Sequence, residues 1–181
     1  REGRSHCCRS WPWRGRRWRA TRLRNVAARK RITVALALAI AIPAEGLRQY
    51  AYYDPPGILT VCRGHTGPDV QRGRKYSLAE CDAFLTADMR EAVETVDRCV
   101  PGLPDPVLAA FGDATFNLGP TIACDVTHST AARLLLAGDL VGACNQLPRW
   151  SRARVAGVYV VLPGLAKRRA AERALCLEGV T

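Results

Sequence analysis

The sequence contains little that would bind a metal ion or cross a membrane in the usual way. It has three histidines and one methionine, Met89, and its eight cysteines include no C-x₂-C pair. Structural zinc sites need such clusters of cysteine and histidine, so we expect neither a metal nor a cofactor. The apolar run Ile32–Ile42 has 11 residues, which is short against the roughly 20 that a membrane-spanning helix needs.

Acidic residues are scarce only near the N-terminus. Residues 1–31 contain 12 of the 27 lysines and arginines and one of the 16 acidic residues, Glu2. The other 150 residues contain 15 basic and 15 acidic residues, so their formal charge is zero. A protein that binds a nucleic-acid duplex usually presents a basic surface on its folded part. We therefore expect no nucleic-acid partner.

Two segments precede the part of the sequence that we expect to form a domain. Residues 1–31 are rich in arginine and tryptophan, and we interpret them as a disordered basic tail, a membrane-surface segment or sequence upstream of the natural start. Residues 32–44 follow three basic residues and hold the apolar run, a pattern typical of a signal or anchor segment. A buried N-terminal helix is the alternative for this run. Residues 45–181 form the predicted domain.

The stretch Glu45–Gly67, EGLRQYAYYDPPGILTVCRGHTG, holds the candidate catalytic residues. Proline and glycine in Asp54–Gly57 separate two β-prone runs and predict a hairpin. Such a turn would carry Asp54 and Thr60 back toward Glu45. Two carboxylates facing one cleft, one protonated and one ionised, are what hydrolysis of a glycosidic bond requires. A solvated glutamate and a turn-capping aspartate would give the same spacing.

Downstream, the pattern predicts several helices. Ser77 is the expected N-cap of a helix over residues 78–98, and Glu80 occupies the capping-box position three residues later. The apolar, β-branched run Val158–Leu162 fits a strand or a loop packed on the core. Further helices are expected over residues 105–117, 129–137, 140–147 and 165–177.

The full string resembles the active-site segment of the phage-type lysozymes, the endolysins of glycoside hydrolase family 24. In that family Glu, Asp and Thr fall at these spacings, followed by a Gly-His pair. The resemblance covers about residues 44–179 and implies an α+β fold, with a small N-terminal β-hairpin lobe and a larger C-terminal helical lobe joined by a long helix. The matching segments include Ser77–Cys81, Phe116–Gly119, Gly142–Leu147, Arg149–Trp150 and Pro163–Cys176.

The resemblance implies a role for each of these residues. Glu45 would be the general acid, Asp54 the ionised partner, and Thr60 would bind the attacking water through its hydroxyl. We expect Gly64 and His65 to be structural residues near the site, with a general-base role for His65 as the alternative.

Other positions resemble family positions that line the cleft or support the acid. Phe116 and Ser129 would bind substrate, with core packing and helix capping as the alternatives. Arg168 or Arg169 would form an ion pair with Glu45, and a solvated run of charges is the alternative.

The implied function is that of an endolysin. Such a muramidase hydrolyses the β-1,4 bond between N-acetylmuramic acid and N-acetylglucosamine in peptidoglycan and lyses the host cell. Its partner would be peptidoglycan glycan strands, and we expect a monomer. The alternative is a catalytically impaired prophage remnant that binds glycan, which Pro43, two residues before Glu45, favours because proline disturbs a helix.

Some endolysins of this family begin with a signal-arrest-release segment. Residues 32–44 would then hold the enzyme at the host inner membrane and later release it into the periplasm. A cleaved signal peptide, with Ala39-Ile40-Ala41 as the cleavage site, is the rival interpretation.

Six cysteines lie in the predicted domain, at positions 62, 81, 99, 124, 144 and 176. This even number favours disulfides in an oxidising compartment, with buried free thiols as the alternative. Cys144 and Cys176 match positions that pair in family members. We also expect Cys62, which follows the hairpin, to pair with Cys81 at the start of the long helix, which leaves Cys99 and Cys124.

Overall fold

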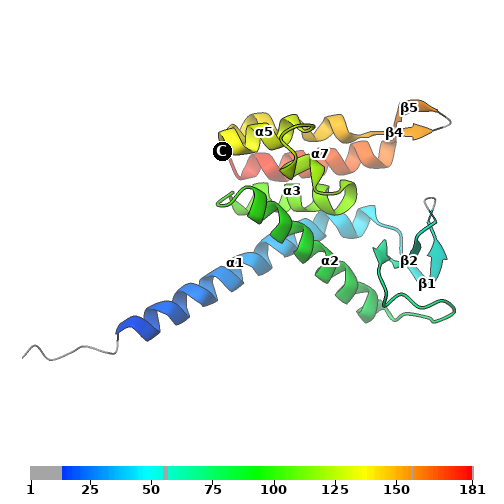
Figure 1. The fold of residues 1–181 in the computed structure, drawn as a ribbon, viewed down its shortest axis with the longest axis horizontal. Helices are drawn as coiled ribbons and strands as arrows, with labels where there is room; N and C mark the ends of the chain where they lie inside the picture. Colours follow the sequence, from blue (N-terminus) through cyan, green and yellow to red (C-terminus); the bar gives the residue numbers. More distant parts are fainter. Residues whose placement is uncertain (1–13, 55–56, 156, 181) are drawn as a thin grey trace, which may run out of the picture. The chain divides into compact units, whose positions relative to one another are not determined.

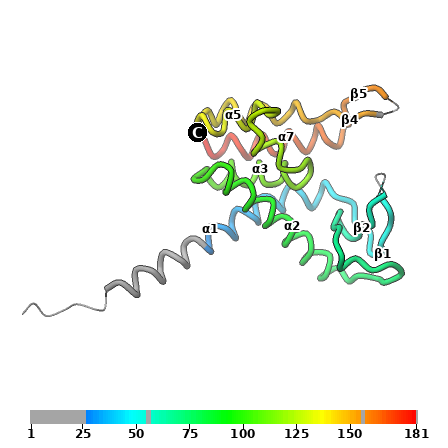
Figure 2. Tube along the Cα trace, viewed as in Figure 1, coloured from blue at the N-terminus to red at the C-terminus, as the bar shows by residue number. Residues whose placement is uncertain are grey.

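The computed structural model of the chain describes residues 14–54, 57–155 and 157–180. The chain divides into two compact units, residues 1–31 and residues 32–181. Helix α1 spans Arg14–Ala44, so residues 14–31 of the predicted tail are helical, whereas residues 1–13 lie outside the described part. Figure 1 shows the elements as a ribbon, and Figure 2 shows the Cα trace.

Three antiparallel strands form the small lobe of the second unit. They are β1 (Arg48–Tyr53), β2 (Leu59–Cys62) and β3 (His65–Thr66), in the order β1-β2-β3. Tyr52 pairs with Thr60, so the chain reverses between β1 and β2 and the predicted hairpin is confirmed. A small core fills the lobe and contains Val61, Cys62, Val70, Tyr76 and Cys81.

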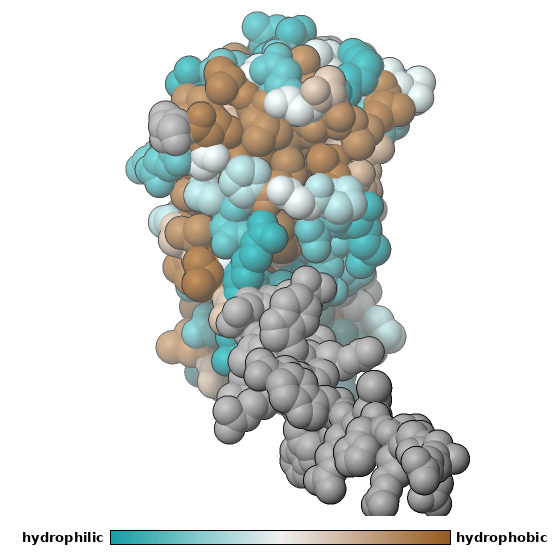
Figure 3. Space-filling view, turned by 90° about the vertical axis from the view of Figure 1, so that its left-hand side faces the viewer, coloured by the Kyte–Doolittle hydropathy of each residue, from teal (hydrophilic) through white to brown (hydrophobic). Residues whose placement is uncertain are grey.

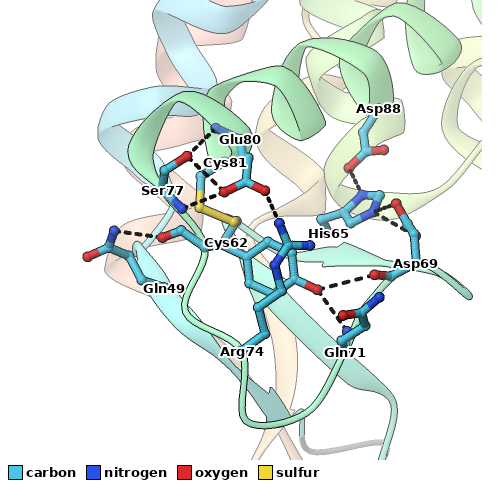
Figure 4. The surroundings of a disulfide bond; sticks show 11 residues. Gln49, Cys62, His65, Asp69, Gln71, Arg74, Ser77, Glu80, Cys81 and Asp88 are labelled. Atoms are coloured by element: carbon cyan, nitrogen blue, oxygen red, sulfur yellow. Dashed lines mark hydrogen bonds and ion pairs between the residues drawn. A yellow bond between two sulfur atoms is a disulfide. The ribbon is translucent and has the colours of Figure 1, made fainter.

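Helix α2, Leu78–Cys99, leads from the small lobe to the helical lobe (Figure 1). The Glu80 N–H donates to Ser77 Oγ at 3.2 Å, and the Ser77 N–H donates to Glu80 Oε2 at 2.8 Å, so the predicted capping box is confirmed (Figure 4). Leu78, the first residue of the helix, is 58% exposed. The buried face consists of Cys81, Leu85, Met89, Ala92, Val93 and Val96.

The helical lobe packs around α3, which contacts both α2 and α7. Gly112 of α3 permits a close approach to α2, because a Cβ there would lie 2.5 Å from Val93 Cγ2. Figure 3 shows hydrophobic residues gathered on the upper part of one face of this lobe. The helices are α3 (Asp105–Leu118), α4 (Thr121–Cys124), α5 (Thr130–Ala137), α6 (Leu140–Cys144), the 3₁₀ helix η1 (Leu147–Trp150) and α7 (Pro163–Glu178). The predicted α+β class is thereby confirmed.

A second hairpin, formed by β4 (Arg152–Val155) and β5 (Val158–Val161), lies between η1 and α7. Of the two alternatives for the run Val158–Leu162, the strand is confirmed for Val158–Val161, and Leu162 is the N-cap residue of α7. The expectation that the run packs on the core is wrong, because all four residues of β5 are exposed, from 38% to 70%.

The apolar part of α1 contributes one face to the main core. Val34, Ala37 and Ala41 are buried at helical spacing, while Ile32 and Ile42 are 56% and 46% exposed. The buried-helix alternative therefore describes this segment in the folded protein, and α1 continues through Pro43. Within residues 14–54, 57–155 and 157–180, no helix combines the length and the apolarity needed to cross a membrane.

All three expected disulfides are present. Cys62–Cys81 joins the small sheet to the start of α2, with a Cα–Cα distance of 5.0 Å (Figure 4). Cys99–Cys124 and Cys144–Cys176 join helices of the large lobe. Each bridge closes a loop of the unfolded chain and contributes about 2–4 kcal/mol to stability.

Candidate active site

Glu45 follows the last turn of α1 and lies where the two lobes meet. Its N–H donates to Ala41 O at 2.9 Å, and its side chain is 23% exposed. Arg63, from the turn between β2 and β3, donates to the carbonyl oxygens of Ile42 and Glu45, both at 3.1 Å. A cation is favourable at a helix C-terminus, so Arg63 fastens the small lobe to the end of α1. No local pattern in the sequence predicts this contact.

The carboxylate of Glu45 is held by Arg168 of α7. Arg168 Nη1 donates to Glu45 Oε1 at 2.5 Å, so of the two arginines that we considered, the structure selects Arg168. Asp113 of α3 holds the same guanidinium from the other side, accepting from Nε at 2.9 Å and from Nη2 at 2.8 Å. The side chains of Arg168 and Asp113 are 3% and 0% exposed. Glu45 is thus positioned by a bidentate ion pair that is almost completely buried.

A second buried pair lies behind the first. Arg169 Nη2 donates a hydrogen bond to Glu172 Oε1 with both side chains fully buried, and Arg168 Nε lies 3.7 Å from Glu172 Oε1. Burial, followed by the hydrogen bond and the charge of neighbouring Asp113, raises the pKa of Glu172 to about 10. Glu172 therefore keeps its proton near neutral pH.

The two arginines respond to burial in opposite ways. Burial by itself would lower the pKa of Arg168, but the hydrogen bonds and charges of Asp113 and then Glu45 raise it above its ordinary value. Burial lowers the pKa of Arg169. With Glu172 neutral, the carboxylate of Asp113 is the fully buried group that compensates the charge of Arg168.

Replacing Glu172 by glutamine tests this assignment through the pH dependence of stability. In the unfolded chain Glu172 loses its proton near its ordinary pKa of 4.5, and in the folded protein it does so only near 10. Between these values unfolding releases a proton, so wild-type stability falls with rising pH by up to about 1.4 kcal/mol per pH unit. Glutamine has no proton to release, so we expect the stability of Glu172→Gln relative to wild type to increase from about pH 5 to about pH 8.

Urea unfolding at the two pH values measures this difference. Glu91→Gln, an exposed change on α2, is the control and should follow wild type at both. A difference between Glu172→Gln and wild type that stays constant with pH would show that Glu172 is ionised in the folded protein.

Asp54 and Thr60 share one anchor in the hairpin, the backbone of Ile58. The Ile58 N–H donates to Asp54 Oδ1 at 2.7 Å, and Thr60 Oγ1 donates to Ile58 O at 3.0 Å. Asp54 is partly exposed at the end of β1, and Thr60 is 3% exposed in the central strand. Because the Thr60 proton is engaged, its hydroxyl oxygen is left to accept a hydrogen bond.

The tyrosines of β1 have surroundings of their own. Tyr50 is 56% exposed, and the Tyr52 ring stacks against the Arg48 guanidinium at 4.3 Å. The small lobe therefore contributes Arg63 rather than tyrosine rings to the environment of Glu45.

His65 is placed as a structural residue would be. Its Nδ1 lies 2.8 Å from Asp88 Oδ2 and its Nε2 lies 3.2 Å from Asp69 Oδ2 (Figure 4). The ring also stacks on Phe84 with centroids 4.1 Å apart. Gly64 takes φ +93° in the adjacent turn, a conformation that favours glycine. With both ring nitrogens directed at carboxylates, His65 connects β3 to α2, which supports the structural interpretation.

Phe116 borders a cavity of about 410 Å³ between β3, α2 and α3. Three threonine side chains and two carboxylates give this cavity a polar lining, and Phe116 gives it one aromatic ring. The lining residues are Gly64, Thr66, Asp88, Glu91, Ala92, Thr95, Thr115, Phe116 and Pro120. The neighbouring Asn117 borders a second cavity, of about 600 Å³, which also includes Glu45 and Arg168. Phe116–Asn117 thus separates two hollows, one of which contains the candidate acid.

Ser129 does not border either cavity. It is fully buried, its Oγ donates to Ile122 O at 2.7 Å, and it accepts from the Ala132 N–H at 3.2 Å as the N-cap of α5. The expectation that Ser129 binds substrate is therefore corrected in favour of the capping alternative, because the hydroxyl is already used and no part of it reaches solvent.

Comparison with known proteins identifies the family to which this fold belongs. The sequence profile described as "Phage lysozyme" matches residues 43–172. The SAR-endolysin of Bacteriophage PS119 is 38% identical over 136 residues, which cover 75% of this chain and 77% of that protein. The active form of P1 phage endolysin Lyz superposes with a TM-score of 0.67 at 26% identity over 81% and 85% of the two chains.

A further solved structure, the muramidase domain of SpmX from Asticaccaulis excentricus, matches with a TM-score of 0.68. It is 30% identical and covers 81% of this chain and 95% of its own. The family profile spans more than half of the chain, and the fold that it describes is the one observed. The chain belongs to the phage lysozyme family.

Proposed function

We propose that Glu45, Asp54 and Thr60 are the catalytic residues of this protein, which is a peptidoglycan-cleaving lysozyme of the endolysin type. The observation that carries the proposal is the placement of Glu45. It ends α1 at the junction of the lobes, borders a cavity, and has its carboxylate fixed by Arg168. A catalytically impaired remnant is not favoured, because Pro43 is accommodated within α1 and Glu45 is still held by that contact.

Glu45 acts as the general acid in this mechanism. It donates its proton to the glycosidic oxygen between N-acetylmuramic acid and N-acetylglucosamine. As the proton leaves, negative charge develops on the carboxylate, and Arg168 Nη1 already lies 2.5 Å from Oε1. Arg168 is a positioning residue, and Asp113 fixes its guanidinium so that no reorganisation is needed during the reaction.

Asp54 and Thr60 act on the water molecule that attacks the sugar. The Asp54 carboxylate supports the oxocarbenium-like transition state and accepts the proton that the attacking water loses, and the Thr60 oxygen accepts a hydrogen bond from the water. Because both side chains are anchored to Ile58, they keep a constant separation. Direct attack by this water gives the inverting mechanism.

The glycan strand lies along the cavity beside Phe116. Hydroxyl and carboxylate groups lining it, such as Thr66, Asp88 and Glu91, match the hydroxyl and acetamido groups of the sugars. The Phe116 ring offers an apolar face for a sugar ring. The loss of turbidity of permeabilised Gram-negative cells, measured for wild type beside Glu45→Gln, tests the assignment.

We further propose that the apolar part of α1 holds the enzyme at the inner membrane before it acts in the periplasm. Only Pro43 and Ala44 separate Ile42 from Glu45, and an extended residue spans at most about 3.6 Å. While Ile32–Ile42 lies in a bilayer, Glu45 is kept at the headgroups, and the core lacks the face formed by Val34, Ala37 and Ala41. Release completes the core and brings Glu45 to Arg168.

Replacing Ala35 and Ala39 by leucine tests this retention. Both residues are exposed in the fold, so the changes do not overpack the core, and each leucine favours the membrane by roughly 0.3–0.6 kcal/mol. We expect more protein in the membrane fraction and delayed lysis.

The control for this experiment is Ala83→Leu with Ala87→Leu, an exposed pair at the same spacing on α2. Unchanged timing of lysis, or an active form whose N-terminus is Ile42, would exclude the proposal.

A further inference from the structure

The β4–β5 hairpin leaves apolar side chains uncovered on both of its faces. Arg154 pairs with Tyr159 and Ala153 pairs with Val160, and neighbouring residues of a strand point to opposite faces. Val158 and Tyr159 are 63% and 70% exposed, and Val160 and Val161 are 38% and 52% exposed. Four consecutive exposed large hydrophobic residues are unusual on a soluble protein and indicate an interaction surface.

The chain segment that includes the hairpin carries charge of one sign. No aspartate or glutamate occurs from Leu140 to Ala171. Four basic side chains in this interval are exposed, and they belong to Arg149, Arg152, Arg154 and Lys167. Arg154 Nε donates to Gly157 O at 3.1 Å, which directs its side chain along the hairpin turn. The partner of this surface is therefore anionic.

The apolar residues decide between anionic partners. A glycan strand offers hydroxyl, amide and carboxylate groups but no apolar phase in which valine side chains lose contact with water. A second copy of the hairpin would bring arginines of like charge together. A bilayer with anionic headgroups accommodates both the apolar and the basic side chains of the hairpin. Tyrosine and arginine bury their apolar parts in such an interface and keep their polar tips in water.

We propose that the β4–β5 hairpin docks the folded helical lobe onto an anionic lipid surface. Arg152 and Arg154 contact the headgroups, and Val158, Tyr159 and Val160 enter the boundary with the acyl chains. This contact is separate from the apolar segment of α1 and does not depend on the assignment of the catalytic residues.

Amide hydrogen exchange of the full chain tests the proposal directly. Vesicles of phosphatidylglycerol and phosphatidylethanolamine are the probe, and phosphatidylcholine vesicles are the neutral control. We expect residues 152–161 to gain protection on the anionic vesicles only, while residues 130–141 of the same lobe do not change. If the protein bound vesicles through residues 1–31 instead, the hairpin would stay unprotected, and that result would overturn the proposal. Protection of the hairpin by insoluble peptidoglycan but not by vesicles would overturn it as well.

Vesicle sedimentation of variants provides a second measurement. Each basic residue near an anionic surface contributes about five-fold to binding, so Arg152→Ser with Arg154→Ser should weaken it about 25-fold. Val158→Ser with Val160→Ser should weaken it roughly tenfold. Equal losses in the matched controls would contradict a specific role for the hairpin. These controls are the exposed pairs Arg90→Ser with Arg98→Ser and Leu136→Ser with Val141→Ser.

Discussion

Replacing Glu45 by glutamine is expected to lower the rate of glycan cleavage by at least about 10²-fold. Glutamine has nearly the same volume and still accepts a hydrogen bond from Arg168, but it has no proton to give to the leaving oxygen. The fold should be unaffected, because Glu45 is partly exposed and its backbone contacts with Ala41 and Arg63 remain. The loss of turbidity of permeabilised cells measures the rate, and thermal unfolding checks the fold.

Glu91→Gln is the matched control for the loss of a carboxylate at the cleft. Glu91 lines the cavity beside Phe116, so it shares the substrate surface but has no part in proton transfer. We expect its rate to stay within a few-fold of wild type. If Glu45→Gln were equally mild, Glu45 would not be the acid.

Replacing Asp113 by asparagine is expected to damage both stability and activity. Asparagine accepts through one oxygen, and its amide group faces the donors of Arg168, so the bidentate contact is lost and a buried cation is left uncompensated. Breaking a buried ion pair costs about 3–5 kcal/mol, which lowers the melting temperature of a protein of this size by roughly 10 °C. Activity should fall at least tenfold, because Arg168 no longer holds Glu45 in place.

Asp82→Asn, an exposed change on α2, is the control and should stay within about 0.5 kcal/mol of wild type. A test of KM and kcat separates positioning from general damage, because loss of positioning lowers kcat in the fraction that remains folded. Full activity and an unchanged melting temperature in Asp113→Asn would show that the pair with Arg168 is not needed.

Features fixed by neighbours in the sequence were predictable. The capping box of Ser77 and Glu80 spans three residues, and the hairpin before Thr60 follows from proline and glycine between β-prone runs. The pairing of Cys144 with Cys176 was predicted for a different reason, because it followed from the resemblance to a known family and not from a local pattern.

Features that depend on distant partners were not predictable. Asp113 and Arg168 are 55 residues apart, and no local pattern joins them. The sequence nevertheless contained a hint of this ion pair, because Asp113 is the one acidic residue after the first turn of the mostly apolar helix α3. A carboxylate buried by such a helix is stable only if it is paired with a cation or a hydrogen-bond donor.

Composition also did not reveal which apolar residues would be covered. The run Val158–Val161 has the pattern of a core strand, yet its only partner strand in the described part of the chain is β4, and both faces stay open. The sequence likewise did not reveal that the Ser129 side chain would be buried. Its hydrogen bonds with Ala132 and Ile122 are visible only in the fold.

The chemistry of the cleaved ends tests the central claim most directly. Purified peptidoglycan is digested with wild-type protein, the products are reduced with borohydride, and their masses are determined. Hydrolysis by a muramidase leaves N-acetylmuramic acid at the new reducing ends, and we expect these ends for wild type and their absence for Glu45→Gln. New reducing ends of N-acetylglucosamine, anhydro-sugar ends or free amino groups from cleaved peptides would contradict the claim.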